Sequence, residues 1–306
     1  MRAVIQRAWG GPDVLEVAEV PRPEAGPGEV LVRVAAAGVN PADWKIRSGA
    51  VRRFGEPPFT LGLDVAGVVE AVGGGVSGFR PGDAVFGNTA PPDGSYAEFV
   101  AVPQERLAHV PDGLDLVHAA ALPTAALTAW QPLVRVAGVS AGQRVLVHAA
   151  GGGVGHLAVQ IAKARGAYVI GTARAAKHAF LRGLGADELV DYTVEDFAEA
   201  VRDVDVVLDP IAGDYGPRSL RTLKPGGLLV DVRGTGPDRT EVRRLADEAG
   251  LRFTGFGFAP SGADLAELAG AGVRAVVDEV LPLEDAAKAH ALSETGRVAG
   301  KIVLAV

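Results

Sequence analysis

The sequence contains no cysteine among its 306 residues. It therefore has neither a disulfide scaffold nor a thiolate metal site, and cysteine usage leaves the redox compartment open. Its six histidines are scattered, and no pair has the i, i+4 spacing that would place two metal ligands on one helix face. These histidines are His109, His118, His148, His156, His178 and His290. The side chains that usually hold zinc are thus scarce or dispersed.

No run of five or more basic residues occurs, and the formal net charge is −7. This balance argues against nucleic acid as the main partner. The N-terminal segment lacks the apolar core of a signal peptide. Residues 116–134 are uncharged, but their prolines, threonines and alanines predict a buried pair of helices and not a membrane span. We expect a soluble, cytoplasmic protein that binds neither nucleic acid nor membrane.

A glycine cluster lies between an apolar strand and an amphipathic helix. Residues 145–147 predict a buried strand, the glycines follow, and a second apolar strand at 168–172 completes a βαβ unit. Glycines let the backbone approach a diphosphate, and the helix N-terminus offers unpaired N–H groups to it. The sequence therefore predicts a dinucleotide site that includes Gly152, Gly153, Val154 and Gly155.

Acidic residues are absent from residues 149–186, where the average content of the chain predicts roughly four or five. An NAD site usually carries an acid at the end of the second strand to bind the ribose. Here that position is Ala173, followed by Arg174 and, one helical turn later, Lys177. The two cations would attract a 2′-phosphate, so the sequence predicts NADPH as the cofactor. We expect the other basic residues of this segment, Lys163, Arg165 and Arg182, to be solvated.

The pattern of elements changes along the chain. Up to about residue 120, short runs at 14–20, 29–36, 65–72 and 96–102 between Pro/Gly turns predict β-structure. Strands then alternate with helices, with further strands expected at 188–190, 205–208, 228–232 and 253–258. This alternation predicts a parallel sheet covered by helices on both faces. A final helix–strand–helix–strand, with strands at 273–280 and 301–306, is less clearly part of that sheet.

Ordered motifs along the whole chain resemble the medium-chain dehydrogenase/reductase superfamily, in its zinc-free, zeta-crystallin-like quinone oxidoreductase branch. They are AAAGVNPADWKIRSG, LGLDVAGVVEAVG, PGDAVFG, GSYAEFV, LPTAALTAW, VLVHAAGGGVG, LGADELVDY, KPGGLLVDV and GKIVL. The resemblance implies an α/β protein with a GroES-like catalytic domain of residues 1–123 and 261–306. It further implies a doubly wound Rossmann domain of residues 124–260 that binds NADPH, and a homodimer.

The chain departs from the zinc-dependent members of this family. The positions that match their two cysteines and one histidine carry Asn40, Leu63 and Thr124. Leucine has no donor atom, and amide and hydroxyl groups are poor zinc ligands. We therefore expect no metal, and without a Lewis acid ordinary alcohol oxidation is disfavoured. Hydride transfer to an electron-poor acceptor remains feasible.

The resemblance also implies roles for individual residues. Asn40, Lys45 and Thr128 match positions near the reacting groups. Asn40 could donate to an oxyanion, Lys45 could pair with the cofactor ribose or with the developing enolate, and Thr128 could touch the nicotinamide, so Lys45 and Thr128 are also cofactor positions. Asp43 and Asp64 are expected to brace loops, and water to supply the proton. The other matching cofactor positions are Tyr192, Val232, Arg233, Gly234, Phe256, Gly257 and Phe258.

Three functions stay open at this point. The first is NADPH-dependent reduction of a quinone, and the second is reduction of an α,β-unsaturated ketone or aldehyde. Both need an apolar cleft and no metal, so the sequence does not separate them. The third is a cofactor-binding protein with little turnover.

Overall fold

The computed structural model describes residues 1–234 and 238–306, which divide into two compact units. Unit 1 comprises Met1–Leu127 and Pro260–Val306, and unit 2 comprises Thr128–Ala259. Helix α3 (Pro123–Trp130) contains residues of both units. We describe each unit separately.

Unit 2 is built on a six-stranded, fully parallel sheet with the order β11-β10-β9-β12-β13-β14. This order is that of the doubly wound dinucleotide-binding fold, in which the strand order reverses beside the first strand. The predicted fold class is therefore confirmed. The strands are β9 (Arg144–Val147), β10 (Tyr168–Thr172), β11 (Glu188–Val190), β12 (Val204–Asp209), β13 (Leu223–Asp231) and β14 (Arg252–Gly255).

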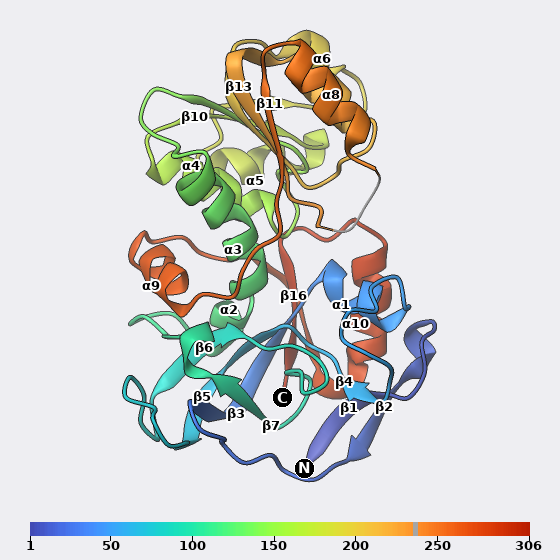
Figure 1. Cartoon of the computed structure of the whole chain (residues 1–306), viewed down its shortest axis with the longest axis vertical. Helices are drawn as coiled ribbons and strands as arrows, with labels where there is room; N and C mark the ends of the chain where they lie inside the picture. The colour runs from blue at the N-terminus through green and yellow to red at the C-terminus, as the bar shows by residue number, and fades with distance from the viewer. Residues whose placement is uncertain (235–237) are drawn as a thin grey trace. The chain divides into compact units, whose positions relative to one another are not determined.

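Helices cover both faces of this sheet because its strands are apolar on both sides. Helix α4 packs on β9 and β10, whereas α7 and α8 pack on β12, β13 and β14 and on each other (Figure 1). Between α8 and the sheet, Val242 and Ala246 join a buried cluster with Leu146 and Leu229. The helices are α4 (Gly155–Ala164), α5 (His178–Gly183), α6 (Phe197–Ala200), α7 (Tyr215–Leu220) and α8 (Thr240–Glu248).

In unit 2, two expected strands differ from those observed by three residues or more at one end. The strand expected at 253–258 is too long, because β14 ends at Gly255 and residues 256–258 have no regular secondary structure. The strand expected at 228–232 is part of a longer one, since β13 begins at Leu223. The carboxyl ends of these strands, where ligands sit in such sheets, therefore lead directly into loops.

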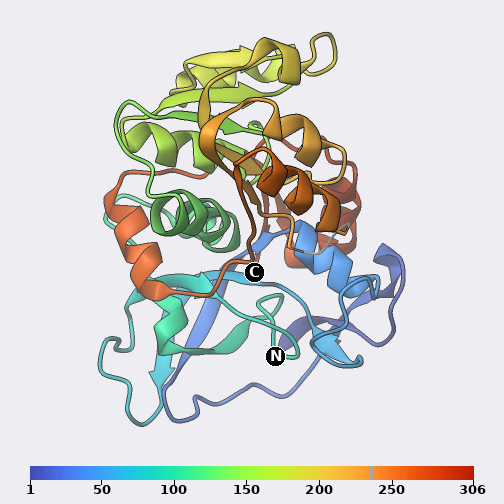
Figure 2. The same ribbon diagram turned by 45° about the horizontal axis from the view of Figure 1, so that its top comes forward.

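Unit 1 combines two sheets, in which all strand pairs but β15 with β16 are antiparallel, with short helices (Figure 2). The larger sheet has the order β15-β16-β3-β5-β6-β8, and β7 also pairs with β3; the smaller has the order β2-β1-β4. The strands are β1 (Arg2–Gln6), β2 (Leu15–Glu19), β3 (Glu29–Val39), β4 (Phe59–Thr60), β5 (Asp64–Val72), β6 (Ala84–Asn88), β7 (Phe99–Pro103), β8 (Leu107–His109), β15 (Val277–Pro282) and β16 (Lys301–Ala305). The helices are α1 (Pro41–Arg47), α2 (Leu116–Ala120), α9 (Gly262–Gly270) and α10 (Ala286–Glu294).

The C-terminal segment returns to the sheet of unit 1. Strand β16 pairs antiparallel with β3 and parallel with β15, so neither β15 nor β16 belongs to the sheet of unit 2. The strand expected at 273–280 lies a few residues later, at Val277–Pro282. The pairing of β3 and β16 places the start of β16 beside the end of β3, which matters for the site below (Figure 1).

The uncharged segment of residues 116–134 forms helices α2 and α3 and the first residues of a π-helix at Gln131–Val136. Residues 119–133 are buried throughout, as expected for a buried helix pair. Across the described part of the chain, no helix has the length and apolar character needed to cross a membrane.

Candidate cofactor and acceptor site

The glycine-rich turn after β9 fits a diphosphate. Ala149 has a positive φ of 48°, and α4 begins six residues later at Gly155. A Cβ on Gly155 would overlap the backbone of Ala149 and Ala150, so the close packing of helix against strand requires glycine there. The first turn of α4 carries no acidic residue. Its N-terminal N–H groups and helix dipole are therefore suited to bind an anion.

Arg174 and Tyr192 come together beyond the ends of β10 and β11. The Arg174 Nε donates a hydrogen bond to the Tyr192 hydroxyl at 3.2 Å, and both side chains are exposed. Lys177 lies near the glycine turn, since its Nζ donates to the Gly151 carbonyl at 3.0 Å. A guanidinium, an ammonium and a phenol from one edge of the sheet thus offer donors suited to a phosphate.

An acid lies near these cations, although in sequence it falls outside the acid-poor segment. Asp191 accepts from the backbone N–H of Ala175 at 2.9 Å and from Thr193 at 2.9 Å and 2.7 Å. These hydrogen bonds keep the pKa of Asp191 below its usual value. The carboxylate therefore anchors the start of the segment that carries Lys177.

The loops that follow β12 and β13 are tied to each other. Arg233 Nη1 donates to the Ile211 carbonyl at 2.7 Å, which connects residues 209–211 with residues 232–234. Val232 is buried, whereas Arg233 and Gly234 are exposed. The structure thus places these expected cofactor positions at the carboxyl edge of the sheet, where ligands bind in this class of fold.

The loop after β14 is held by the π-helix. The Gln131 side chain donates to the Ala259 carbonyl at 2.9 Å and accepts from its N–H at 3.0 Å. These two bonds fix the end of the segment that contains Phe256, Gly257 and Phe258. Gln131 follows directly on α3, which carries the buried Thr128.

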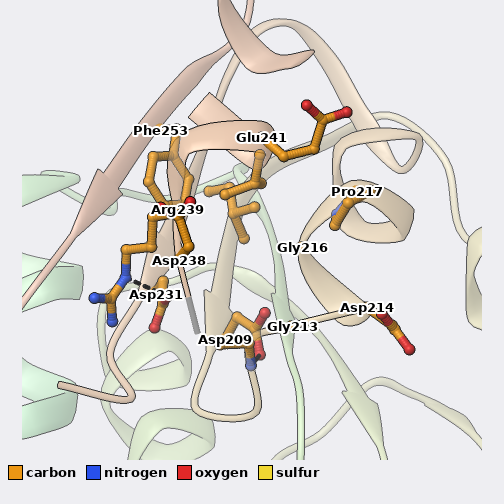
Figure 3. Close-up of a pocket in the computed structure, with 13 residues that line it drawn as sticks. Asp209, Gly213, Asp214, Gly216, Pro217, Asp231, Asp238, Arg239, Glu241 and Phe253 are labelled. Atoms are coloured by element: carbon orange, nitrogen blue, oxygen red, sulfur yellow. Dashed lines mark hydrogen bonds and ion pairs between the residues drawn. The ribbon is translucent and has the colours of Figure 1, made fainter. Parts of the chain in front are cut away.

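A cavity of about 260 Å³ lies between α7, α8 and the carboxyl ends of β12 and β13 (Figure 3). Arg239 Nε contacts Asp231 there at 2.6 Å, and the lining also includes Asp209, Asp214, Asp238 and Glu241. Asp209 accepts from the N–H groups of Ile211 and Ala212, and burial raises its pKa. Because acidic side chains repel phosphate, we assign no part of the cofactor to this cavity.

In unit 1, strand register gathers polar residues at one edge of the sheet. Gly38 pairs with Asp64, Asp64 pairs with Asn88, and Ile302 pairs with Val39. The residues at or next to these pairs, Asn40, Asp64, Asn88 and Lys301, are therefore neighbours, and all are nearly fully buried. A Cβ on Gly38 would overlap the Ala120 carbonyl oxygen and lie 3.0 Å from the Asp64 side chain, so this close packing requires glycine.

Asp64 is the centre of this cluster. Its Oδ2 accepts from Asn40 Nδ2 at 2.8 Å, and its Oδ1 accepts from the Thr124 N–H at 2.8 Å and from Asn88 Nδ2 at 3.1 Å. Burial raises the pKa of Asp64, and the Lys301 ammonium 3.7 Å away opposes that rise. Two of the three positions that match zinc ligands, Asn40 and Thr124, are thus hydrogen-bonded to one carboxylate.

These residues do not fit a zinc ion. Leu63, at the third matching position, has no donor atom, and Asn40 presents its oxygen to Lys301 at 2.5 Å. Among the residues that the structure describes, no group of three or more acidic, histidine or cysteine side chains is arranged to hold a metal. We therefore derive no step through a metal.

Asp43 begins a second chain of buried contacts. Its Oδ2 accepts from the Asn40 N–H at 2.7 Å, which caps helix α1, and from the Tyr96 hydroxyl at 3.3 Å. Tyr96 is 3.2 Å from His290 Nε2, and His290 Nδ1 is 3.3 Å from Arg47. Burial and Arg47 lower the pKa of His290 to about 3, so the ring is neutral and accepts from Arg47 at Nδ1. As expected, Asp43 and Asp64 brace loops.

Lys45 stands in the last turn of α1, one and a half turns from Asn40 at its N-cap. Its side chain is half-buried, and its ammonium lies 5.7 Å from the Trp44 ring. Asn40 and Lys45 are therefore presented by the same short helix. Thr128 belongs to unit 2.

Two side chains that complete the buried cluster, those of Lys301 and Asn88, were not expected from the sequence. The signal for Lys301 was present, because it is the only charged residue in the otherwise apolar strand KIVLA. Asn88 has no comparable signal, since its role depends on the pairing of β5 with β6.

Comparison with known proteins gives the family. Residues 26–112 match the alcohol dehydrogenase GroES-like domain, and residues 184–304 match a family described as zinc-binding dehydrogenase. A quinone oxidoreductase of Lama guanicoe is 35% identical, covering 99% of this chain and 97% of that protein. A 2-haloacrylate reductase of a Burkholderia species is 36% identical, covering 99% and 98%.

Solved structures agree in fold and differ in the activity named. A structure described as an NAD-dependent alcohol dehydrogenase has a TM-score of 0.92 and 38% identity, with 100% of both chains covered. A mycobacterial protein solved with NADPH has a TM-score of 0.89 and 33% identity, again with 100% of both chains covered. The fold and site define an NAD(P)H-dependent oxidoreductase. The chain belongs to the medium-chain dehydrogenase/reductase superfamily, in its zinc-free, quinone-oxidoreductase-like branch.

Proposed function

We propose that this protein is an NADPH-dependent, zinc-independent reductase that transfers hydride to a quinone. The observation that carries this proposal is the set of Asn40, Leu63 and Thr124 at the zinc-matching positions, two of them bound to Asp64. Reduction of an α,β-unsaturated ketone or aldehyde is the second candidate, supported by the similarity to a 2-haloacrylate reductase, whose named substrate is an activated alkene. A cofactor-binding protein with little turnover is the third.

The proposed cofactor site lies in residues 124–260. The turn with Gly152, Gly153, Val154 and Gly155 would hold the diphosphate against the N-terminus of α4. Arg174, Lys177 and Tyr192 would bind the 2′-phosphate, which is what distinguishes NADPH from NADH. The mycobacterial relative solved with NADPH supports this choice of cofactor.

The remaining contacts are proposed for the nicotinamide end. They come from the loops after β13 and β14 and from α3, namely Val232, Arg233, Gly234, Phe256, Gly257, Phe258 and Thr128. When bound, NADPH supplies the hydride. The acceptor gains this hydride at carbon, its displaced electron pair moves onto oxygen, and water supplies the proton.

Residues of the catalytic domain, proposed as 1–123 and 261–306, would stabilise the charge on that oxygen. Asn40 can donate from its amide, because Nδ2 carries two hydrogens and Asp64 takes one of them. Lys45, on the same helix, adds a cation. A quinone or enone spreads the charge over a conjugated system, so these groups suffice where a simple alkoxide would need a metal ion. A cytoplasmic location and a homodimer remain predictions.

A panel of acceptors tests the proposal, with NADPH oxidation followed by absorbance. The panel contains a naphthoquinone, a linear enone, the matching saturated ketone and, with NADP⁺, a simple alcohol. Rapid turnover of the quinone supports the first candidate, and rapid turnover of the enone with a slow quinone supports the second. NADPH binding without turnover of any acceptor would support the third candidate, a cofactor-binding protein with little turnover. Robust alcohol oxidation would contradict all three.

A further inference from the structure

Lys301 is a buried cation that has no role in the proposed reaction as described above. It begins β16, and its side chain is only 3% exposed. Its Nζ donates to the Val39 carbonyl at 2.9 Å and to Asn40 Oδ1 at 2.5 Å, and it lies 3.7 Å from Asp64 Oδ2. Burial lowers the pKa of this ammonium, while Asp64 and Asp43 act to keep it charged. Burial of an ammonium group lowers the stability of the fold unless its hydrogen bonds and a nearby carboxylate compensate for the lost hydration.

The contacts of Lys301 fix which way the Asn40 amide points. An ammonium can only donate, and an ionised carboxylate can only accept. Lys301 therefore selects the amide oxygen and Asp64 selects the amide nitrogen, so the two together exclude the flipped amide. In this orientation the hydrogen of Nδ2 that does not face Asp64 is the one that another acceptor can use.

The charge of Lys301 matters as well. An anion at Asp64 beside the reacting oxygen would oppose the negative charge that develops there. Lys301 offsets that field, and the Thr124 N–H and the Asn88 amide satisfy the far oxygen of Asp64. Without the ammonium, Asn40 Oδ1 would lose its donor, only the Asp64 contact would hold the amide, and the charge of Asp64 would stay uncompensated.

We propose that Lys301 is a positioning residue for the reduction: with Asp64 it clamps the Asn40 amide so that Nδ2 presents its second hydrogen to the acceptor oxygen. This inference rests on the proposed function. In this role Lys301 helps to stabilise, through Asn40, the negative charge on the acceptor oxygen, whereas a lysine with only a structural role would not affect that charge.

The first test compares two acceptors in three variants. Lys301→Met removes donor and charge, Lys301→Gln keeps an N–H donor, and Lys288→Met is the control, because Lys288 is exposed on α10. An enolate is more basic than a quinol anion, so it gains more from an oriented donor. We expect Lys301→Met to lower kcat about thirtyfold with an enone and about threefold with a quinone. KM and the NADPH dissociation constant should change less than about twofold. The kcat of Lys301→Gln should lie between those of the wild type and Lys301→Met, and the kcat of Lys288→Met should equal that of the wild type.

The second test needs neither cofactor nor turnover. Hydrogen exchange of the Asn40 side-chain amide, identified by its loss in Asn40→Ala, is followed by ¹⁵N NMR in the cofactor-free protein. For the Nδ2 hydrogen that faces Asp64, we expect slow exchange in the wild type and in Lys288→Met, and exchange at least about tenfold faster in Lys301→Met. Should Lys301→Met fail to fold, Lys301→Met/Asp64→Asn removes both buried charges and serves in its place.

The outcomes distinguish the positioning role of Lys301 from the proposed reductase function. Unchanged amide exchange, or an equal loss of kcat with both acceptors, would overturn the clamp. A wild-type protein that oxidises NADPH with neither acceptor would overturn the proposed function, whatever the amide exchange shows.

Discussion

The preference for NADPH over NADH can be tested where the structure brings Arg174, Lys177 and Tyr192 to one edge of the sheet. The perturbation is Arg174→Ala/Lys177→Ala. A charge-assisted hydrogen bond contributes about 1.5–3 kcal/mol when shielded from water. Arg174 is exposed and Lys177 half-buried, so solvent screening reduces this to about 1–1.5 kcal/mol each.

Together the two losses predict NADPH binding weaker by about 2–3 kcal/mol, which is roughly 30- to 150-fold in the dissociation constant. NADH has no 2′-phosphate, so its binding should change little. Lys177 must also exchange its present contact with the Gly151 carbonyl for the phosphate, which favours the lower end of the range.

The assay is titration of the protein with NADPH and with NADH, followed by the fluorescence of the reduced nicotinamide. Arg182→Ala is the matched control, because Arg182 is an exposed cation of the same segment that we expect to be solvated. Three results would contradict a phosphate site at Arg174 and Lys177: tighter binding of NADH than of NADPH by the wild type, an unchanged preference for NADPH in the double variant, or an equal loss of NADPH affinity in Arg182→Ala.

Three further predictions concern metal, catalysis and pH. Elemental analysis of dialysed protein should find no stoichiometric zinc, and chelators should leave activity intact; zinc whose removal abolishes activity would contradict the assignment of Asn40, Leu63 and Thr124. Lys45→Met should lower kcat by roughly ten- to a hundredfold, about 1.4–2.7 kcal/mol, with NADPH still bound; unchanged steady-state kinetics would remove Lys45 from the site. Burial raises the pKa of Asp43 to about 7, above its value in the unfolded chain, so Asp43 lowers stability as pH rises from about 4 to 7. The free energy of unfolding of Asp43→Asn, measured with urea, should therefore increase relative to that of the wild type over this pH range, by on the order of 2–4 kcal/mol. A difference between the two proteins that does not change with pH would contradict the raised pKa of Asp43.

The parts of the fold that depend on local pattern were predictable from the sequence. The βαβ unit with Gly155 follows from apolar runs that flank glycines, and β9, β10 and β11 were correctly expected. The ends of strands were less certain, as β14 shows, because residues 256–258 remain apolar after the strand has ended. An apolar run does not by itself mark the end of a strand, since Phe256 and Phe258 are only half-buried and Gly257 is exposed.

The buried cluster of unit 1 could not be predicted, because it depends on register between distant strands. Lys301 meets Asn40 across 261 residues of chain through the pairing of β16 with β3. A shift of one residue in that pairing would turn the Lys301 side chain to the other face of the sheet. Asn40 and Lys301 each lie in a motif that was noted in the sequence, but only the structure shows that the two side chains are hydrogen-bonded.

The central claim is metal-free hydride transfer from NADPH to an electron-poor carbon. Its most direct test uses chelator-treated protein, an enone, a naphthoquinone and NADPH in which both hydrogens at C4 of the nicotinamide are deuterium. The account predicts that NADPH is consumed in step with reduced acceptor, and that enone product, where formed, carries deuterium on its β-carbon. Turnover that requires added zinc, or reduced enone without deuterium at that carbon, would contradict it.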